Sequence, residues 1–372
     1  MKAIGIILAG GNNNRMKELT AKRAVPALPI AGSFRAIDFS LSSMSNSHIQ
    51  TVAVLTQYNA RSLNEHLSSA KWWNFGRKQG GLFLFTPTVT ADNSDWYRGT
   101  ADAMYQNIDF LKRRHEPYVI ISSGDCVYKL DFNRVLDFHI EKKSDITVVC
   151  KDMMYNDDVS RFGVVRMDDE SRITEFDEKP IDASSNTIST GIYVIRRRQL
   201  IELLEAAAEE NRFDFVNDIL VRYKNVKKIY GYKINSYWNN IADIDAYFKT
   251  NMDFLRPDVR SYFFKEEPTI CSKVDDLPPA KFNPGSEISN SLVSSGCIIN
   301  GSVEDSVLFK QVFVGKNTTV KNCVILNDVY IGDNVHLENC IVESRGTINP
   351  NTCYCGEDGV MIVKEKNVRY VI

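Results

Sequence analysis

The segment GKNTTVKNC at residues 315–323 returns as GDNVHLENC at residues 332–340, so that Gly315 matches Gly332 and Cys323 matches Cys340. Around this repeat an apolar residue returns every five or six positions: Leu292, Ile298, Val303, Leu308, Val314, Val320, Ile325, Ile331, Leu337, Val342 and Ile348. Three near-hexapeptides per coil, each with one apolar residue pointing inward, are typical of a triangular β-helix. The interval from Gly315 to Gly332 is one position shorter than three full hexapeptides, and we expect a corner to absorb the difference. An irregular β-sandwich would not predict a constant interval, so residues 288–372 are interpreted as a left-handed parallel β-helix.

Residues 1–250 have a different pattern, in which short apolar runs alternate with stretches of helical period. Four runs are expected to be strands buried on both faces: residues 4–8, 51–55, 118–121 and 146–149. Buried strands separated by helices predict a mostly parallel, Rossmann-like α/β sheet with ligands at the carboxyl ends of its strands. The proline-containing residues 251–287 have little periodicity and are predicted to be a linker.

Composition excludes several classes of protein. Of the 372 residues, 44% are hydrophobic and 25% charged, with 45 Lys+Arg against 47 Asp+Glu. Because no segment is strongly basic, we expect no nucleic-acid partner. No apolar run approaches the roughly 20 residues of a membrane-spanning helix, so we expect no membrane. The start runs from Lys2 through apolar residues straight into Gly10 without a cleavage site, which favours a buried strand over a signal peptide.

The eight cysteines contain no CxxC pair, and Cys353-Tyr354-Cys355 is too tight for an ordinary zinc knuckle. We therefore expect reduced, mostly buried thiols and a cytoplasmic location.

A glycine pair follows the first predicted strand, in Leu8-Ala9-Gly10-Gly11, and Arg15 lies just beyond it. Backbone amides beside two glycines can approach a triphosphate, and an arginine can neutralise its charge. Taken alone, the pair would be explained equally well by a tight turn.

Further segments make the chain resemble the sugar-1-phosphate nucleotidyltransferases, particularly the bacterial, ADP-glucose-forming glucose-1-phosphate adenylyltransferases. The resemblance covers essentially the whole chain and is carried by RAVPALP (23–29), RAIDF (35–39), WYRGTADA (96–103), SSGDCVYKLD (122–131) and YWNNIADIDAY (237–247). It implies a nucleotidyltransferase type A domain followed by a β-helix, with ATP and glucose 1-phosphate as ligands. It also implies a set of nucleotide contacts: Leu8, Gly10, Gly11, Arg15, Tyr97, Gly99 and Thr100.

Asp125 ends a predicted strand, where a carboxylate can hold Mg²⁺ between phosphates or cap the next helix. By resemblance, Asp125 is the metal ligand, and Asp125 and Arg15 are catalytic. The family has a lysine at Val25, a second carboxylate at Asn240, a histidine at Cys126 and a loop glycine at Asn13. Since the lysine and the second carboxylate are missing, we predict a weak or absent Mg²⁺ site and impaired catalysis.

The sugar-phosphate side keeps the residue types of the family. The resemblance implies that glucose 1-phosphate contacts Gly163, Glu178, Lys179, Ser189, Gly191, Asp214, Phe215 and Trp238. On its own, the Glu178-Lys179 pair would be interpreted as a surface turn before Pro180.

This asymmetry predicts a regulatory, weakly active or inactive subunit, similar to the GlgD-type subunit of the family. We expect it to form a hetero-tetramer with a catalytic homologue in glycogen synthesis. The alternative is a competent adenylyltransferase with an altered loop, and a remote one is a hexapeptide-repeat acyltransferase using His336 as general base. The family's basic residue before the Arg-x-Ile-Asp segment is Ser33 here, which argues against a shared effector site.

Overall fold

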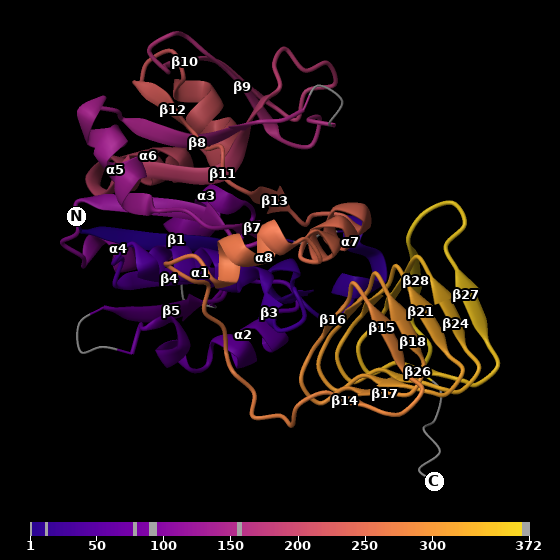
Figure 1. The fold of residues 1–372 in the computed structure, drawn as a ribbon. Coiled ribbons are helices and arrows are strands. Elements are labelled where there is room, and N and C mark those ends of the chain that lie inside the picture. Colours follow the sequence, from indigo (N-terminus) through magenta and orange to yellow (C-terminus); the bar gives the residue numbers. More distant parts are fainter. Residues whose placement is uncertain (1, 12–13, 77–79, 89–94, 155–157, 367–372) are drawn as a thin grey trace.

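A computed structural model describes residues 2–11, 14–76, 80–88, 95–154 and 158–366 of the chain. Figure 1 shows an α/β domain built from the N-terminal two-thirds of the sequence, with a β-helix at its side. No helix within these described ranges is both long and apolar enough to cross a membrane.

Within the described residues, nine strands form one sheet in the α/β domain. They are β1 (Ala3–Ala9), β4 (Thr51–Thr56), β5 (Gly81–Phe85), β6 (Tyr118–Ser123), β8 (Ile146–Asp152), β9 (Gly163–Met167), β10 (Ile173–Glu178), β11 (Thr187–Arg196) and β12 (Ile229–Lys233). The main path is β10-β9-β11-β6-β1-β4-β5, with β8 between β11 and β12. The expected strands are therefore confirmed as β1, β4, β6 and β8. The sheet is mixed, because β10 and β11 run against the others.

Helices cover both faces of this sheet. They are α1 (Ala36–Asn46), α2 (Arg61–Leu67), α3 (Thr100–Tyr105), α4 (Ile108–Lys112), α5 (Phe132–Glu141) and α6 (Arg197–Glu209). Successive residues of β1 enter opposite cores: Ile7 packs with residues of α1 and α5, and Ile6 with residues of α3 and α6. Both faces of the strand are thus buried, as the unbroken apolar runs predict.

Residues 281–363, all described, form three parallel five-stranded sheets. The first contains β14 (Lys281–Phe282), β17 (Ile298–Ile299), β20 (Phe313–Val314), β23 (Tyr330–Ile331) and β26 (Thr347–Ile348). The second contains β15 (Glu287–Ser289), β18 (Ser302–Glu304), β21 (Thr319–Lys321), β24 (His336–Glu338) and β27 (Cys353–Cys355). The third contains β16 (Leu292–Val293), β19 (Val307–Leu308), β22 (Val324–Ile325), β25 (Cys340–Val342) and β28 (Met361–Val363). The parallel β-helix is confirmed.

The corners of the β-helix explain why the sequence repeat falls one position short of three hexapeptides. Left-handed residues, with φ of 47–60°, stand at Gln311, Asn317 and Asn322 and again at Asp328, Asn334 and Asn339. Their successive spacings of six, five and six positions add up to one coil, so one corner comes a position earlier than the others, as expected. Asparagine suits these corners because its short polar side chain tolerates positive φ.

Two of the expected inward residues were wrong by one position. Ile298 is 39% exposed, and Ile299 is buried in its place; likewise Val293 faces the β-helix core and Leu292 faces the α/β domain. The physical reason is a shorter early coil. Ile299 pairs with Val314, and Val314 with Ile331, so the first of these two coils is two positions shorter than the second and the regular period runs out of register there.

The two domains share an apolar core, which we call the interdomain cluster. It joins Val25 and Phe39 of the α/β domain, two helices at the junction, α7 (Ile244–Asp253) and α8 (Pro257–Phe264), and one outer column of the β-helix. That column is Leu292, Val307, Val324 and Ile341. Figure 1 shows α7 and α8 between the domains. Residues 251–287 therefore contain helices and the first β-helix strands as well as a connecting segment.

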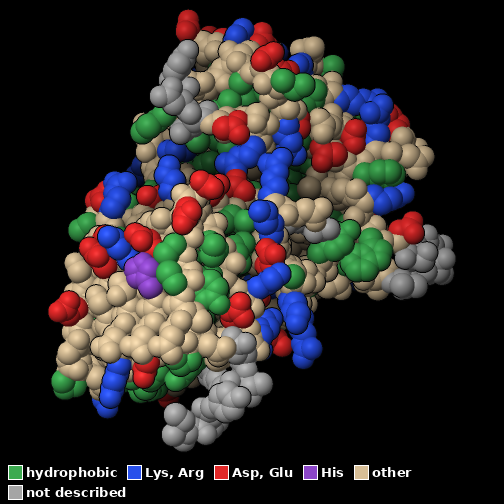
Figure 2. All heavy atoms as spheres, turned by 90° about the vertical axis from the view of Figure 1, so that its right-hand side faces the viewer, with side chains coloured by type: hydrophobic (Ala, Val, Ile, Leu, Met, Phe, Trp, Pro, Cys, Tyr) green, Lys and Arg blue, Asp and Glu red, His purple; other side chains and the backbone are tan. Residues whose placement is uncertain are grey.

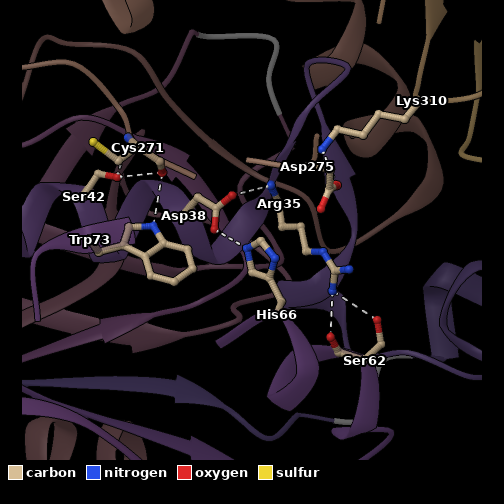
Figure 3. A network of polar contacts seen from close by, with 9 residues as sticks. All are labelled: Arg35, Asp38, Ser42, Ser62, His66, Trp73, Cys271, Asp275 and Lys310. Atoms are coloured by element: carbon tan, nitrogen blue, oxygen red, sulfur yellow. Dashed lines mark hydrogen bonds and ion pairs between the residues drawn. The ribbon is translucent and has the colours of Figure 1, made fainter. Parts of the chain in front are cut away.

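The connecting segment is tied to both domains (Figure 3). The backbone of Cys271 exchanges two hydrogen bonds with the Ser42 hydroxyl of α1 and accepts one from the Trp73 indole. A little further along the chain, Asp275 forms an ion pair of 2.8 Å with Lys310 of the β-helix. The segment is thus held against the α/β domain at one point and against the β-helix at the next.

Candidate nucleotide site

A cavity of about 510 Å³ opens at the carboxyl ends of β1, β4 and β6. It is lined by most of the residues expected on the nucleotide side: Leu8, Gly10, Gly11, Val25, Tyr97, Gly99, Thr100 and Asp125. These residues are far apart in sequence and meet because the carboxyl ends of parallel strands share one edge of a sheet. Leu55, Gln57, Tyr58 and Ser123 also line it, and the sequence did not indicate any of them as ligand contacts.

Gln57 fixes the backbone of Tyr97 in the cavity wall. The Gln57 Oε1 accepts the Tyr97 N–H at 2.6 Å, and its Nε2 donates to the Tyr97 carbonyl at 3.2 Å. The Tyr97 ring turns into the core, where its hydroxyl accepts a hydrogen bond from Asn107. Gln57 lies just after β4, so its place at a strand's carboxyl end was the signal that could have found it.

Gly99 is required by close packing and not by its backbone conformation. Its φ of −176° suits any residue, but a Cβ there would lie 2.3 Å from the Phe213 carbonyl oxygen. The same carbonyl accepts the N–H groups of Ala101 and Asp102, at 2.8 and 3.2 Å. Thr100 accepts the Phe215 N–H at 2.9 Å. The start of α3 is thereby fixed to the segment implied to hold the sugar.

The two loop glycines differ in what surrounds them. A Cβ at Gly10 would lie 3.2 Å from that of Gln57, whereas a Cβ at Gly11 would meet no atom of the described residues within 4 Å, its chain neighbours aside. Gly11 therefore leaves open space where a ligand could approach the backbone. Arg15 lies in the short helix η1 (Asn14–Thr20), exposed and outside the cavity lining. Asn13 lies outside the described residues.

Asp125 stands in the cavity wall beside two hydrogen-bond donors. The Ser123 hydroxyl donates to its Oδ1, and the Cys126 thiol approaches the same oxygen at 3.5 Å. Burial, and next the charge of Asp125, raise the pKa of Cys126 well above its ordinary value, so this thiol stays protonated. The carboxylate therefore faces neutral donors.

Asn240 lies next to this group on β13 (Trp238–Asn240), opposite Cys126 on β7 (Cys126–Tyr128). Its Nδ2 donates to the Cys126 sulfur at 3.4 Å, and its Oδ1 accepts the Ala242 N–H at 3.0 Å. Both ends of the amide are therefore engaged. Asp243, the next carboxylate along the chain, caps α7 and pairs with Arg161.

The residues around Asp125 fit Mg²⁺ poorly. Magnesium needs oxygen ligands and is usually held by one or two carboxylates together with substrate phosphates. Among the described residues, Asp125 is not part of any group of three or more metal-ligand side chains, and the amide oxygen of Asn240 is already bonded. The two-carboxylate arrangement implied by the resemblance is not formed.

Val25 occupies the position of the expected lysine and lies in the short helix η2 (Val25–Ala27). It is 4% exposed, and it belongs at once to the cavity wall and to the interdomain cluster. A hydrocarbon side chain there provides packing and no charge for a phosphate.

The sugar-side residues lie outside the cavity lining, and Gly163, Glu178 and Lys179 lie together at the end of β10. A Cβ on Gly163 would lie 3.0 Å from Glu178 Oε2, so the Glu178 side chain lies over that glycine. Lys179 is exposed and pairs with Glu178 at 3.1 Å. Burial raises the pKa of Tyr193, and the charges of Glu178 and Asp214 raise it further, because both carboxylates lie near that ring.

Gly191 brings the sugar side and the nucleotide cavity together. Its φ is 74°, which favours glycine, and a Cβ there would lie 3.5 Å from Ser123 of the cavity. The Ser189 hydroxyl is close to the Gly191 N–H and to the Tyr193 hydroxyl, at 3.4 and 3.3 Å. Asp214 accepts the Asn217 N–H at 2.7 Å.

The two aromatic residues expected against the sugar are buried. Phe215 is 1% exposed and packs on Tyr193, with ring centres 5.2 Å apart. Trp238 is 5% exposed and packs edge-on against Phe162 at 5.7 Å. Both rings therefore belong to the hydrophobic core and offer a sugar little open surface.

A second cavity, of about 1150 Å³, lies between the α/β domain and the β-helix. The described cations in its lining outnumber the acids eight to four: Lys22, Arg23, Arg35, Arg61, Lys273, Lys310, Arg345 and Lys366 against Glu65, Asp275, Asp328 and Glu343. Figure 2 shows Lys and Arg side chains gathered along this junction. Ser33 is in the lining too. Figure 3 shows Arg35 reaching across to Ser62.

Two family models match the two parts of the chain. The nucleotidyl transferase model matches residues 4–256, and a model described as GlmU-like, C-terminal hexapeptide matches residues 278–362. The glucose-1-phosphate adenylyltransferase of Geobacillus stearothermophilus is 39% identical over 365 residues, covering 97% of this chain and 94% of the relative. The chain belongs to the glucose-1-phosphate adenylyltransferase family.

Two other members of the family are similar to this chain over most of its length. The adenylyltransferase of Bacillus subtilis is 36% identical over 322 residues, 86% of this chain and 84% of its own. That of Pseudothermotoga lettingae is 39% identical over 322 residues, 86% of this chain and 76% of its own. The family resemblance seen in the sequence motifs is thereby confirmed, and so is the two-domain fold that it implied.

Proposed function

We propose that this chain is a regulatory, catalytically impaired subunit of a glucose-1-phosphate adenylyltransferase. It acts in ADP-glucose synthesis for glycogen, from ATP and glucose 1-phosphate, as one partner of a hetero-tetramer with a catalytic homologue. The observation that carries this proposal is the state of Asn240, whose oxygen accepts the Ala242 N–H and whose nitrogen donates to Cys126. The position where the family resemblance implies a second carboxylate is therefore an amide with both ends bonded.

The missing charges account for impaired turnover. Phosphoryl transfer depends on positioning and on charges held around the phosphates. Removing one preorganised donor costs roughly 10²–10³ in rate in well-studied cases, and here the expected lysine is the buried Val25. The open backbone at Gly11 and the Gln57–Tyr97 contact remain, so the cavity can still hold a nucleotide.

The interdomain cluster supports a regulatory role. Val25 of the cavity wall and Val307 and Val324 of the β-helix belong to it together. A change in how the β-helix packs would therefore reach the nucleotide cavity through contacting side chains. The cation-rich cavity at the same junction offers a place where an anion could bias that packing.

One experiment tests the proposal directly. The chain is purified alone and mixed with a catalytically competent homologue, and ADP-glucose formation and oligomer mass are measured for each sample. We expect the lone chain to reach about 1% or less of the rate of the mixture, and we expect a mixed tetramer. A lone chain as active as the mixture, or failure to co-assemble, would contradict the proposal.

The competing function is a competent adenylyltransferase with an altered loop. It is favoured by Asp125, which still lies in the cavity wall with Gly10 and Gly11. In that case a phosphate oxygen of glucose 1-phosphate would attack the α-phosphorus of ATP in line, and the bond to the leaving pyrophosphate would break. The catalytic groups would be Asp125 in the cavity wall and Arg15, which lies outside the lining. Brisk turnover by the lone chain would select this function.

A further inference from the structure

Four metal-ligand side chains meet on the outer face of the last two strands of one β-helix sheet. His336 and Glu338 lie on β24, and Cys353 and Cys355 lie opposite them on β27, paired His336–Cys353 and Glu338–Cys355. Residues i and i+2 of a strand point to the same side. Leu337, between the first two, is fully buried in the β-helix core, so His336 and Glu338 point outward.

Three of the four side chains already lie close enough to share one metal ion, and Cys353 lies next to the third of them, Cys355. One ligand atom each of His336, Glu338 and Cys355 lies within 4.8 Å of the other two. The His336 Nε2 is 3.6 Å from Glu338 Oε2, and the two sulfurs of Cys353 and Cys355 are 3.6 Å apart. Tetrahedral zinc with bonds of about 2.3 Å to sulfur and about 2.0 Å to nitrogen or oxygen has edges of about 3.3–3.8 Å.

Exposure separates these two cysteines from most of the others. All eight cysteines lie in the described ranges; five are buried, and the remaining three are Cys271, Cys353 and Cys355. Cys271 lies in the connecting segment, tied by its backbone to Ser42. Cys353 and Cys355 alone stand together on an accessible face. Their close spacing argued against a zinc knuckle in the sequence, but the preceding coil of the β-helix supplies the other two ligands.

We propose that His336, Glu338, Cys353 and Cys355 bind one Zn²⁺. Thiolate and imidazole ligands select zinc over the hard cations Mg²⁺ and Ca²⁺, which prefer oxygen. Both thiols lose their protons on binding. The ion joins β27, the last strand of its sheet, to β24 of the coil before it, and so stabilises the outer end of the β-helix (Figure 1). Figure 2 views the molecule from this side.

The test uses the full-length chain, reduced and freed of metal with a chelator. Zn²⁺ is titrated in competition with a chromogenic chelator, and Co²⁺ serves as a spectroscopic probe of thiolate ligation. We expect one Zn²⁺ per chain with an apparent Kd below about 0.1 µM. The double variant Cys353→Ser, Cys355→Ser should bind at least about 100-fold more weakly, since outer-shell changes alone cost roughly 10–100-fold. Cys271→Ser, the matched control, should bind as the parent does.

Thermal unfolding supplies a second readout. Zn²⁺ should raise the Tm of the parent and of Cys271→Ser but not of the double variant. If the double variant does not fold, His336→Ala and Glu338→Gln replace it, each expected to weaken zinc binding and to abolish or reduce the Tm shift. The proposal is overturned if the parent binds no Zn²⁺ at 1:1, or if the site variants bind it as tightly as the Cys271→Ser control.

Discussion

Asn240 donates its side-chain amide to the sulfur of Cys126, at 3.4 Å, across the ribbon formed by β13 and β7. The family resemblance places a carboxylate at the first position and a histidine at the second, so two of the departures from the motif contact each other. A carboxylate at 240 would face a thiol held protonated by burial and by the charge of Asp125. A carboxylate at position 240 alone would therefore lie near that of Asp125, with no added cation to offset the two negative charges.

Restoring both missing charges should raise the activity of the lone chain. The double variant Val25→Lys, Asn240→Asp places a cation in the wall that contains Asp125 and an anion beside Cys126, the neighbour of Asp125, and we expect ADP-glucose formation to increase on the order of 100-fold. The measurement is steady-state turnover at saturating ATP and glucose 1-phosphate.

The single variants are the controls for this rescue. Asn240→Asp alone should gain little, since the new carboxylate repels Asp125, and Val25→Lys alone should gain less than the pair. A double variant that folds, judged by its Tm, yet stays at the parent's rate would show that the impairment lies elsewhere, for example at Asn13.

Gly99→Ala should destabilise the fold by about 1–3 kcal/mol. The new Cβ would lie 2.3 Å from the Phe213 carbonyl oxygen, and because that oxygen belongs to the backbone, the backbone itself would have to shift. Gly11→Ala is the matched control: since no described residue beyond its chain neighbours lies within 4 Å of the new Cβ, it should change stability by less than about 0.5 kcal/mol. Urea unfolding measures both. Equal stabilities for the two variants would contradict the packing argument. ATP binding by Gly11→Ala, compared with the parent, would show whether a ligand uses that space.

His66→Ala should lower the free energy of unfolding by about 3–5 kcal/mol. Its Nε2 lies 2.6 Å from Asp38 Oδ1, both side chains are buried, and Figure 3 shows Asp38 also accepting the Arg35 N–H. Removing the histidine leaves the buried Asp38 carboxylate with the Arg35 N–H but without its contact to the imidazole. His115→Ala, at a position outside the core, should change stability by less than about 0.5 kcal/mol. A loss below about 1 kcal/mol in His66→Ala would contradict this prediction.

Stability should fall between pH 7 and pH 5 in a way that depends on His139. Burial, and next the charge of Arg196, lower the pKa of His139 from 6.5 to about 4, while Asp145 opposes the shift. The unfolded state then binds the proton more readily, so this stabilisation is complete above pH 6.5 and is lost as the pH falls toward 4. The loss between pH 7 and pH 5 is about 2 kcal/mol.

His139→Asn is the comparison for this titration, because Asn can still meet Thr147, which His139 Nδ1 contacts at 2.8 Å. The variant should be less stable than the parent at pH 7, but its further loss on going to pH 5 should be smaller by about 2 kcal/mol. Urea midpoints at the two pH values measure the difference. Parallel pH profiles for the two proteins would show that His139 is not the titrating group.

The sequence predicted those features that repeat or that depend on neighbouring residues. The four core strands were recognisable because strands buried on both faces are unbroken apolar runs, and the β-helix because each coil repeats the pattern of the coil before it. Where a coil is shorter, at Ile298 and Leu292, the same rule failed by one position. Most of the nucleotide contacts implied by the short motifs line one cavity, although Arg15 does not, and their binding role stays a prediction.

Only the tertiary structure decided which distant residues touch. Three contacts depend on how strands and domains are placed in space: Gln57 binds the backbone of Tyr97, Asn240 donates to Cys126, and Val25 packs both in the cavity wall and against the β-helix. The same is true of Cys353 and Cys355, because β-strand pairing places His336 and Glu338 of the preceding coil beside them. Periodicity determines which face of an element is buried, but chain segments far apart in sequence acquire their partners only when those faces pack together.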